Sequence, residues 1–159
     1  MLQATGVSQW YGDDCVFRNL SMDVETGEVV AIIGPSGVGK TTLLRTLALS
    51  LEPDDGSVTF DGTDVWAADE NERLSLRRRV GMVFQHPRDQ FVAATVGADV
   101  AFGPENLGLA REEIDRRVGE SLAAVNLSGR EDDRIDELSG GERERVAIAG
   151  ALAMEPDHL

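Results

Sequence analysis

The amino-acid sequence predicts an α/β fold, and three neighbouring observations lead to this prediction. Residues 29–33 form a short apolar run that is rich in β-branched side chains, as is typical of a buried parallel strand. A glycine-rich stretch follows directly at residues 34–42. Behind it, apolar residues recur at helical spacing at positions 43, 44, 47, 48 and 51, so we expect a helix to begin near Lys40.

The glycine-rich stretch matches the pattern G-x-x-x-x-G-K-[ST] of a phosphate-binding loop. It consists of Gly34, Pro35, Ser36, Gly37, Val38, Gly39, Lys40, Thr41 and Thr42. Its glycines allow backbone N–H groups to point at a phosphate, and the positive end of the helix dipole faces the same place. We expect Lys40 to reach the β- and γ-phosphates and the Thr41 hydroxyl to bind Mg²⁺. The strand before the loop and the helix after it argue against an ordinary glycine-rich turn, so we expect nucleotide binding.

Composition limits the class of protein. The chain has 159 residues, of which 42% are hydrophobic and 28% are charged, values that are typical of a globular domain with a core. No stretch approaches the roughly 18 apolar residues that are needed to span a bilayer, and the N-terminus lacks the pattern of a signal peptide. The single cysteine, Cys15, excludes an internal disulfide and suits the cytosol.

The charge balance is strongly acidic. The sequence contains 29 acidic and 15 basic residues, for a formal net charge of −14, and Lys40 is its only lysine. This composition is typical of a protein that stays soluble in very high salt; the alternative is an ordinary acidic cytosolic protein. The acidity also argues against a nucleic-acid partner, although high salt would screen surface charge and weaken that argument.

Local patterns predict the remaining elements. We expect strands over residues 2–8, 16–24, 57–60 and 80–84. We expect helices over residues 70–79 and 111–125, the second with an apolar stripe at positions 114, 118, 122 and 125. Between these helices the sequence indicates a polar loop at 86–90, and glycines interrupt the chain that follows.

A second motif lies at Leu138, Ser139, Gly140, Gly141 and Glu142. Ser139 followed by Glu142 is a capping box, and apolar residues at positions 146, 149, 152 and 153 continue a helix behind it. The two glycines leave the N–H groups of the helix start accessible, so this is a second candidate anion site. A well-capped helix start without a ligand is the alternative.

Together these motifs resemble the nucleotide-binding domain of an ABC transporter over essentially the whole chain. Residues 34–42 resemble the Walker A loop, and residues 138–142 match the signature motif. Gln85 resembles the Q-loop glutamine, which in the family touches Mg²⁺ and the attacking water, and Tyr11 resembles the aromatic residue that stacks on adenine. Residues 83–90 and 99–109 resemble the energy-coupling-factor type, which includes cobalt- and nickel-uptake ATPases.

The resemblance implies a fold class and a division into parts. The fold is α/β, a P-loop NTPase (RecA-like) core with an antiparallel β subdomain and an inserted helical subdomain, in which the final core strands are missing. Residues 1–84 would form the N-terminal part of the core with the antiparallel β subdomain. Residues 85–153 would form the Q-loop and the helical subdomain, and residues 154–159 the start of the truncated Walker B strand.

The resemblance also implies a mechanism. Two such domains, identical or different, dimerise head to tail and hold ATP with Mg²⁺ between the phosphate-binding loop of one and the signature helix of the other. A polytopic membrane subunit is moved by closing and opening, so the chain would be cytoplasmic and peripheral on the inner face of the membrane. No nucleic acid is expected as a partner. The transported substrate cannot be inferred from this subunit, because the subunit does not touch it.

The family's Walker B aspartate and catalytic glutamate would follow residue 159. We therefore expect no catalytic residue in this chain, and negligible ATP hydrolysis by the chain alone. Two other functions remain open at this point. One is a soluble ABC ATPase of translation or repair, and the other is an inactive remnant that only binds nucleotide.

Overall fold

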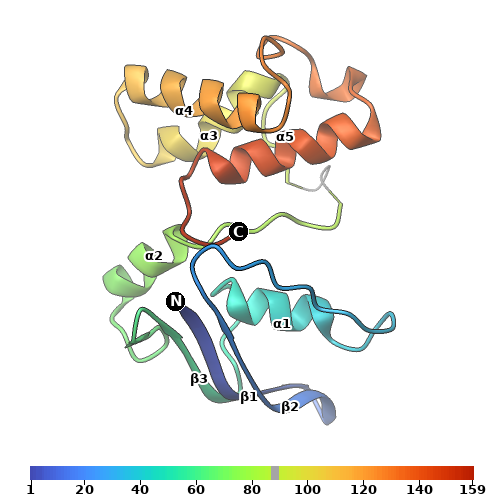
Figure 1. The fold of residues 1–159 in the computed structure, drawn as a ribbon, viewed down its shortest axis with the longest axis vertical. Helices are drawn as coiled ribbons and strands as arrows, with labels where there is room; N and C mark the ends of the chain where they lie inside the picture. The colour runs from blue at the N-terminus through green and yellow to red at the C-terminus, as the bar shows by residue number, and fades with distance from the viewer. Residues whose placement is uncertain (87–89) are drawn as a thin grey trace. The chain divides into compact units, whose positions relative to one another are not determined.

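The computed structural model describes residues 1–86 and 90–159 (Figure 1). The chain divides into two compact units, residues 1–80 with His158 and residues 81–157 with Leu159. Each unit has its own hydrophobic core. Pro87, Arg88 and Asp89, which belong to the stretch that resembles the energy-coupling-factor type, lie outside the described residues.

The first unit is built on an antiparallel sheet with the strand order β2-β1-β3-β4. Strand β1 (Leu2–Tyr11) pairs with β2 (Asp14–Val24) on one side and with β3 (Asp55–Phe60) on the other. The two-residue strand β4 (Thr63–Asp64) pairs with the end of β3. The strands expected over residues 2–8, 16–24 and 57–60 are therefore confirmed, with longer ends.

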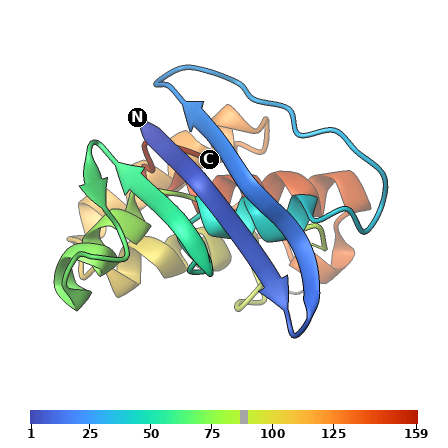
Figure 2. The same cartoon turned by 90° about the horizontal axis from the view of Figure 1, so that it is seen from below.

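Helix α1 (Lys40–Leu47) lies against one face of this sheet (Figure 2). Its Leu43 and Leu47 enter the core, whereas Leu44 is 49% exposed and faces away from it. Helix α2 (Glu70–Arg78) follows the sheet, and its N-cap Asp69 accepts a hydrogen bond of 2.9 Å from the Glu72 N–H. The buried core residues of this unit come from β1, α1, β3 and α2 and from the chain just after α1 and β4: Leu2, Ala4, Val7, Leu43, Leu47, Leu49, Val58, Phe60, Val65 and Leu76.

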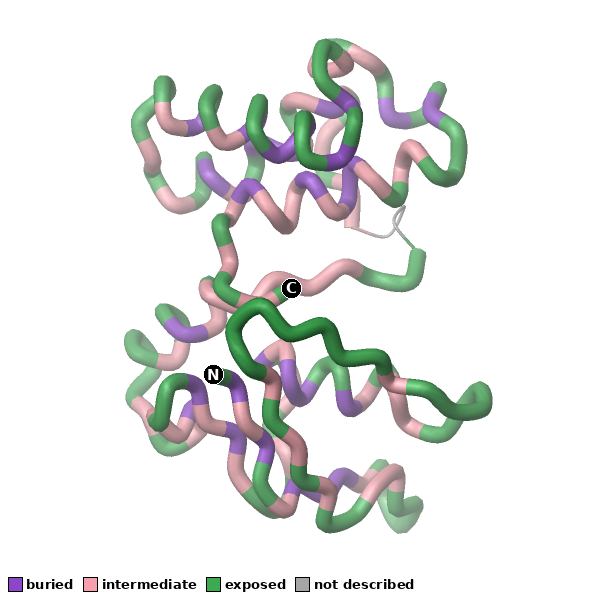
Figure 3. Tube along the Cα trace, viewed as in Figure 1, coloured by how far each residue is buried: buried purple, intermediate pink, exposed green. Residues whose placement is uncertain are grey.

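The buried strand expected over residues 29–33 is wrong for this structure. These residues form irregular coil, in which Val29 is 95% and Ile33 is 91% exposed, and Figure 3 shows most of the segment as exposed. Ile32 is half-buried and packs against the core of this unit. A parallel strand needs neighbours that satisfy its backbone N–H and C=O groups, and layers that cover both of its faces. Among the described residues we find one parallel pairing, the single bridge between Val80 and His158.

The strand expected over residues 80–84 meets the same limit. Val80 forms the bridge to His158, and the His158 N–H donates a hydrogen bond of 3.2 Å to the Arg79 carbonyl oxygen, but residues 81–84 are coil. An apolar β-branched run indicates that a segment can form a strand. It does not supply the neighbouring strand that makes them regular.

The second unit packs three helices around one core. They are α3 (Val96–Asn106), α4 (Arg111–Ala124) and α5 (Gly140–Leu152), with a short 3₁₀ turn, η2 (Ile135–Glu137), before α5. The helix expected over residues 111–125 is confirmed, because all of its apolar stripe is buried. The core of this unit consists of Val96, Val100, Ala101, Ile114, Val118, Leu122, Val125, Leu127, Ile135, Leu138, Val146, Ala149 and Ala153.

Helix α3 occupies a stretch in which the sequence shows glycines and a proline rather than a helical pattern. Pro104 lies inside this helix and is buried, together with Val96 and Val100. Gly103 packs closely on Met154, because a Cβ at this position would overlap Sδ near the end of that flexible side chain. Packing of this kind stabilises helices whose intrinsic propensity is low. The described residues include no helix that is long and apolar enough to cross a membrane.

Candidate nucleotide-binding loop and signature helix

The glycine-rich loop forms a turn that leads directly into α1. Gly37 and Gly39 have φ angles of 81° and 99°, a left-handed backbone that strongly favours glycine. The Val38 N–H donates to the Pro35 carbonyl oxygen at 3.4 Å, which closes the turn. Helix α1 begins at Lys40, and its N-cap Gly39 has no side chain with which to cap it. The N–H groups of the first helical turn are therefore available to an anion.

Lys40 lies over the start of its own loop. Its Nζ donates hydrogen bonds to the carbonyl oxygens of Gly34 at 2.9 Å and of Pro35 at 2.8 Å. Both acceptors are neutral, and a phosphate oxygen would make a stronger, charge-assisted bond to the same ammonium group. The lysine is thus held at the loop, where its ammonium group can exchange these acceptors for a phosphate oxygen.

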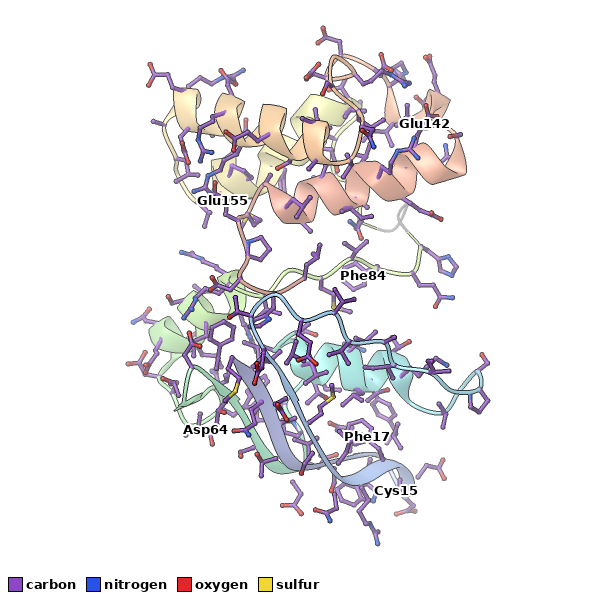
Figure 4. The ribbon with its side chains drawn as sticks, in the orientation of Figure 1. Cys15, Phe17, Asp64, Phe84, Glu142 and Glu155 are labelled. Carbon is purple, nitrogen blue, oxygen red and sulfur yellow. The ribbon has the colours of Figure 1, made fainter. Side chains whose placement is uncertain are left out.

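The loop rests on the beginning of strand β2. A Cβ at Gly39 would come within 2.6 Å of Cγ1 of Val16 and 3.7 Å of Cδ1 of Phe17, so the backbone approaches these side chains closely. Phe17 is marked in Figure 4. Sequence reasoning identified Gly39 but missed Val16, because no pattern in the sequence indicates which residue a glycine will touch. Tyr11, at the end of β1 in the same unit, is 53% exposed.

The donor set of the loop fits a nucleotide with Mg²⁺. Thr41 is exposed in the first turn of α1, and a hydroxyl oxygen is the hard ligand that Mg²⁺ accepts beside phosphate oxygens. The backbone N–H groups of the loop and of the uncapped helix start, together with the lysine, provide the positive potential that a triphosphate requires.

The signature residues form the capped start of α5. The capping box is confirmed: Ser139 Oγ accepts from the Glu142 N–H at 3.3 Å, and Glu142 Oε2 accepts from the Ser139 N–H at 2.8 Å. The Ser139 hydroxyl also donates to the same Oε2 at 2.6 Å. Leu138 is buried in the core of the second unit, whereas Gly140 and Gly141 are exposed.

The Glu142 carboxylate is held strongly in its ionised form. The hydrogen bond from the Ser139 hydroxyl lowers its pKa most, the Ser139 N–H and Arg130 lower it further, and the resulting pKa is about 2. Arg130 Nη1 lies 3.1 Å from Glu142 Oε1, and its Nε pairs with Asp133. Sequence reasoning treated residues 130–137 as a charged connector and missed the pair of Arg130 and Glu142, since no local pattern connects these two residues.

Gln85 is exposed and belongs to the second unit, with the signature residues, whereas the phosphate-binding loop and Tyr11 belong to the first. Side chains fix the chain on both sides of the undescribed residues. The Phe84 N–H donates to Gln90 Oε1 at 3.0 Å (Phe84 is labelled in Figure 4). Beyond Gln90, Asp99 Oδ1 accepts from the Val92 N–H at 2.7 Å and from the Ala93 N–H at 3.0 Å.

A hollow of about 380 Å³ opens in the second unit beside this segment. Its walls combine apolar side chains with two arginines and one aspartate, and are formed by Phe91, Ala93, Ala94, Arg134, Ile135, Asp136 and Arg143. The Arg134 guanidinium pairs with Asp136 at 2.9 Å, which lowers the pKa of that carboxyl group. Arg143 Nη1 donates to the Leu138 carbonyl oxygen at 2.5 Å, and thus joins the hollow to the signature motif.

The family model described as ABC transporter matches residues 17–159, so the chain belongs to the ABC transporter family. The predicted phosphate-binding loop, the predicted signature motif and Gln85 as the predicted Q-loop glutamine agree with this assignment. Within the family, this chain is an ATP-binding subunit of the ABC ATPase class, with the mixed α/β fold and antiparallel sheet of an ABC cassette.

The chain is similar to curated archaeal proteins. It is 57% identical over 159 residues to a protein of Halobacterium salinarum named putative ABC transporter ATP-binding protein. The matched region covers all of this chain and 67% of that protein. It is 48% identical over 158 residues to the energy-coupling factor transporter ATP-binding protein EcfA of Methanothermobacter thermautotrophicus. This match covers 99% of this chain and 50% of EcfA. The chain thus spans half to two thirds of the length of these relatives. The relative from Halobacterium salinarum agrees with the expectation of a high-salt environment.

Solved structures of ABC cassettes closely resemble the structure of this chain. CbiO1 from Clostridium perfringens, described as part of the ABC transporter complex CbiONQ, matches with a TM-score of 0.87 and 36% identity over 98% of this chain and 62% of its own. The dimeric ABC transporter cassette MJ0796 matches with a TM-score of 0.85 and 31% identity, over 98% of this chain and 71% of the MJ0796 chain. A second structure of MJ0796 is described as a post-hydrolysis state bound to ADP and Pi, and it matches with a TM-score of 0.83.

Proposed function

We propose that the chain is the nucleotide-binding part of an ATPase that powers a membrane importer of the energy-coupling-factor type, for a metal ion or a vitamin. One observation carries the proposal. A phosphate-binding loop with an engaged lysine and a capped helix start with bare glycines occur in one chain, in the sequence context of relatives named EcfA. The similarity to EcfA extends over 99% of the chain, so it includes residues 99–109 as well as the general ATPase motifs.

In the proposed mechanism each chain contributes to two different nucleotides. Lys40 and the N–H groups at the start of α1 bind the β- and γ-phosphates, and Tyr11 stacks on the adenine. Thr41 and Gln85 would hold Mg²⁺, which neutralises the charge that develops on the phosphates during hydrolysis. The Ser139 hydroxyl and the N–H groups of Gly140 and Gly141 bind the γ-phosphate of a nucleotide that is held by a second ATPase subunit, identical or different.

ATP then acts as the link between two subunits, since the signature helix meets the γ-phosphate only in the closed dimer. Hydrolysis removes that phosphate and allows the dimer to open. The proposed partner is a polytopic membrane subunit, which places the chain on the cytoplasmic face of the membrane. The hollow described above offers this partner both apolar and charged side chains. The acidic surface makes a nucleic-acid partner unfavourable.

We further propose that this sequence belongs to a longer chain, the full-length gene product, in which residues 29–33 and 80–84 become strands of a parallel sheet. The curated relatives are longer than this chain, and the exposed Val29 and Ile33 are the side chains that such a sheet would bury. Hydrogen exchange tests this directly. Backbone amides of residues 29–33 should exchange slowly in the full-length product and fast in the 159-residue chain; equal rates would contradict the proposal.

For the 159-residue chain alone we propose ATP binding without significant hydrolysis, because the carboxylates that the family uses for Mg²⁺ and for the attacking water are not among its residues. Turnover above background that Lys40→Ala abolishes would disprove this. For the full-length product, the test is light scattering with and without a non-hydrolysable ATP analogue. We expect a dimer that requires the analogue and is lost in Lys40→Ala. Nucleotide binding without association with any ATPase subunit would favour a protein that only binds nucleotide.

A further inference from the structure

The signature helix carries a negative charge at the end that is proposed to receive a phosphate. The Glu142 carboxylate lies in the first turn of α5, and its Oε2 accepts both the Ser139 N–H and the Ser139 hydroxyl. The carboxylate therefore holds the very hydroxyl hydrogen that a phosphate oxygen would need. It would also repel a phosphate at the same helix start, because two like charges that lie close together disfavour each other.

A single guanidinium compensates this charge directly. Arg130 Nη1 lies 3.1 Å from Glu142 Oε1, the carboxylate oxygen that Ser139 does not use. The side chains of Arg130 and Glu142 are 39% and 24% exposed, so the pair is partly shielded from solvent. Asp133 holds the other side of the guanidinium through Nε and fixes its orientation. Arg143, one of the two arginines of α5, donates instead to the Leu138 carbonyl oxygen.

We propose that Arg130 is a positioning residue of the signature site, which compensates the charge of Glu142 so that the N–H groups at the start of α5 accept the γ-phosphate of a nucleotide on a second subunit. This inference rests on the function proposed above. The geometry assigns the role to Arg130 because its Nη1 contacts the Glu142 oxygen that Ser139 does not use, while a different nitrogen, Nε, binds Asp133.

A merely structural role of Arg130 would not depend on the charge of residue 142. Arg130 is required only while residue 142 is a carboxylate. A glutamine at position 142 can still accept the Ser139 N–H through its amide oxygen, but it brings no charge to the anion site. Removal of Arg130 should therefore matter in the natural protein and matter little in Glu142→Gln.

The experiment measures the concentration of the non-hydrolysable ATP analogue that gives half-maximal dimerisation of the full-length gene product. The variants are Arg130→Ala, Arg130→Gln, Arg130→Lys, Glu142→Gln and the double variant Arg130→Ala/Glu142→Gln. We expect Arg130→Ala and Arg130→Gln to raise that concentration roughly three- to tenfold, the range for a solvent-attenuated charge interaction. Arg130→Lys should stay near the natural protein, and the double variant should match Glu142→Gln.

Two results would overturn the inference: Arg130→Ala and Arg130→Gln that dimerise like the natural protein, or a double variant that stays as weak as Arg130→Ala. Thermal unfolding of each variant identifies any that do not fold, and Arg130→Gln keeps the test open if Arg130→Ala is one of them. The loss should also shrink as salt is raised, since salt screens the uncompensated carboxylate. If the natural protein and Glu142→Gln both fail to dimerise, the proposed function fails, and the role of Arg130 fails with it.

Discussion

The ammonium nitrogen of Lys40 donates a hydrogen bond of 2.9 Å to the carbonyl oxygen of Gly34, the first residue of the same glycine-rich loop. The lysine thus reaches from the first turn of α1 back to the first residue of the loop. A loop that is already folded around its lysine loses little conformational freedom when a phosphate arrives, which favours tight binding.

The first prediction concerns this lysine. Lys40→Ala removes the charge-assisted bonds to the phosphates, so we expect ATP affinity to fall by about tenfold to a hundredfold, the equivalent of one or two such bonds. Isothermal titration calorimetry measures the change. Lys40→Arg is the matched control, because it keeps the positive charge but not the shape of the ammonium group, and it should bind ATP more weakly than the natural protein. Unchanged affinity in Lys40→Ala would contradict a role for the loop in binding.

The second prediction compares two glycines of the loop. Gly39→Ala strains a φ of 99° and also drives a Cβ to within 2.6 Å of Val16 Cγ1, whereas Gly37→Ala strains a φ of 81° with open space around it. We expect Gly39→Ala to lower the free energy of unfolding by about 2–4 kcal/mol and Gly37→Ala by about 1 kcal/mol. Urea titration measures both. Equal losses would mean that the packing of the loop on β2 contributes nothing.

The sequence was sufficient where a pattern is local. The capping box of Ser139 and Glu142 depends on residues three positions apart, and the apolar stripe of α4 depends on a helical period, so both were predicted correctly. The phosphate-binding loop was predicted for the same reason: its glycines, its lysine and its helix are contiguous.

The sequence was insufficient where stability depends on distant partners. Residues 29–33 have the composition of a strand, but a strand needs a neighbour, and the described residues provide only the bridge of Val80 to His158 as a parallel pairing. Helix α3 showed the opposite error. Its glycines and Pro104 argue against a helix, and packing against α4 and α5 outweighs them. The pair of Arg130 and Glu142 was missed because it joins two segments that no local pattern connects.

A third prediction separates strain from steric overlap in the antiparallel sheet. Gly56 in β3 and Gly62 in the next turn both have φ of +85°. A Cβ at Gly56 would lie 2.5 Å from the carbonyl carbon and oxygen of Gly6 in β1, whereas a Cβ at Gly62 would meet nothing within 4 Å. Because the obstruction is backbone, β1 and β3 would have to separate. We expect Gly56→Ala to lower the free energy of unfolding by more than about 3 kcal/mol and Gly62→Ala by about 1 kcal/mol.

Chemical denaturation of the two alanine variants checks this prediction, and circular dichroism shows whether the sheet survives. A Gly56→Ala variant as stable as Gly62→Ala would mean that the sheet accommodates the methyl group by a shift of β3. It would also mean that the close approach of Gly56 to Gly6 is not important for the pairing of β1 with β3.

The last prediction concerns the ion pairs that join α4 to the residues after α5. Glu113 Oε1 accepts from Arg116 Nη2 at 2.6 Å and from Arg117 Nε at 2.8 Å, and both arginines also pair with Glu155 (labelled in Figure 4). The hydrogen bonds from Arg116 and then from Arg117 lower the pKa of Glu113 from 4.5 to about 2. Since the folded pKa lies below the unfolded one, the stabilisation is complete above pH 4.5 and is lost as pH falls toward 2.

Glu113→Gln lacks this contribution at every pH, so the difference in Tm between the natural protein and Glu113→Gln should be constant near neutral pH. It should shrink between pH 4.5 and about 2, where the natural carboxylate becomes protonated. Thermal unfolding over this pH range measures the difference. Glu112→Gln, an exposed position in the same helix, controls for the removal of one negative charge. If Glu112→Gln reproduced the same pH dependence, the effect would arise from net charge on the acidic surface rather than from the pairing of Glu113 with Arg116 and Arg117.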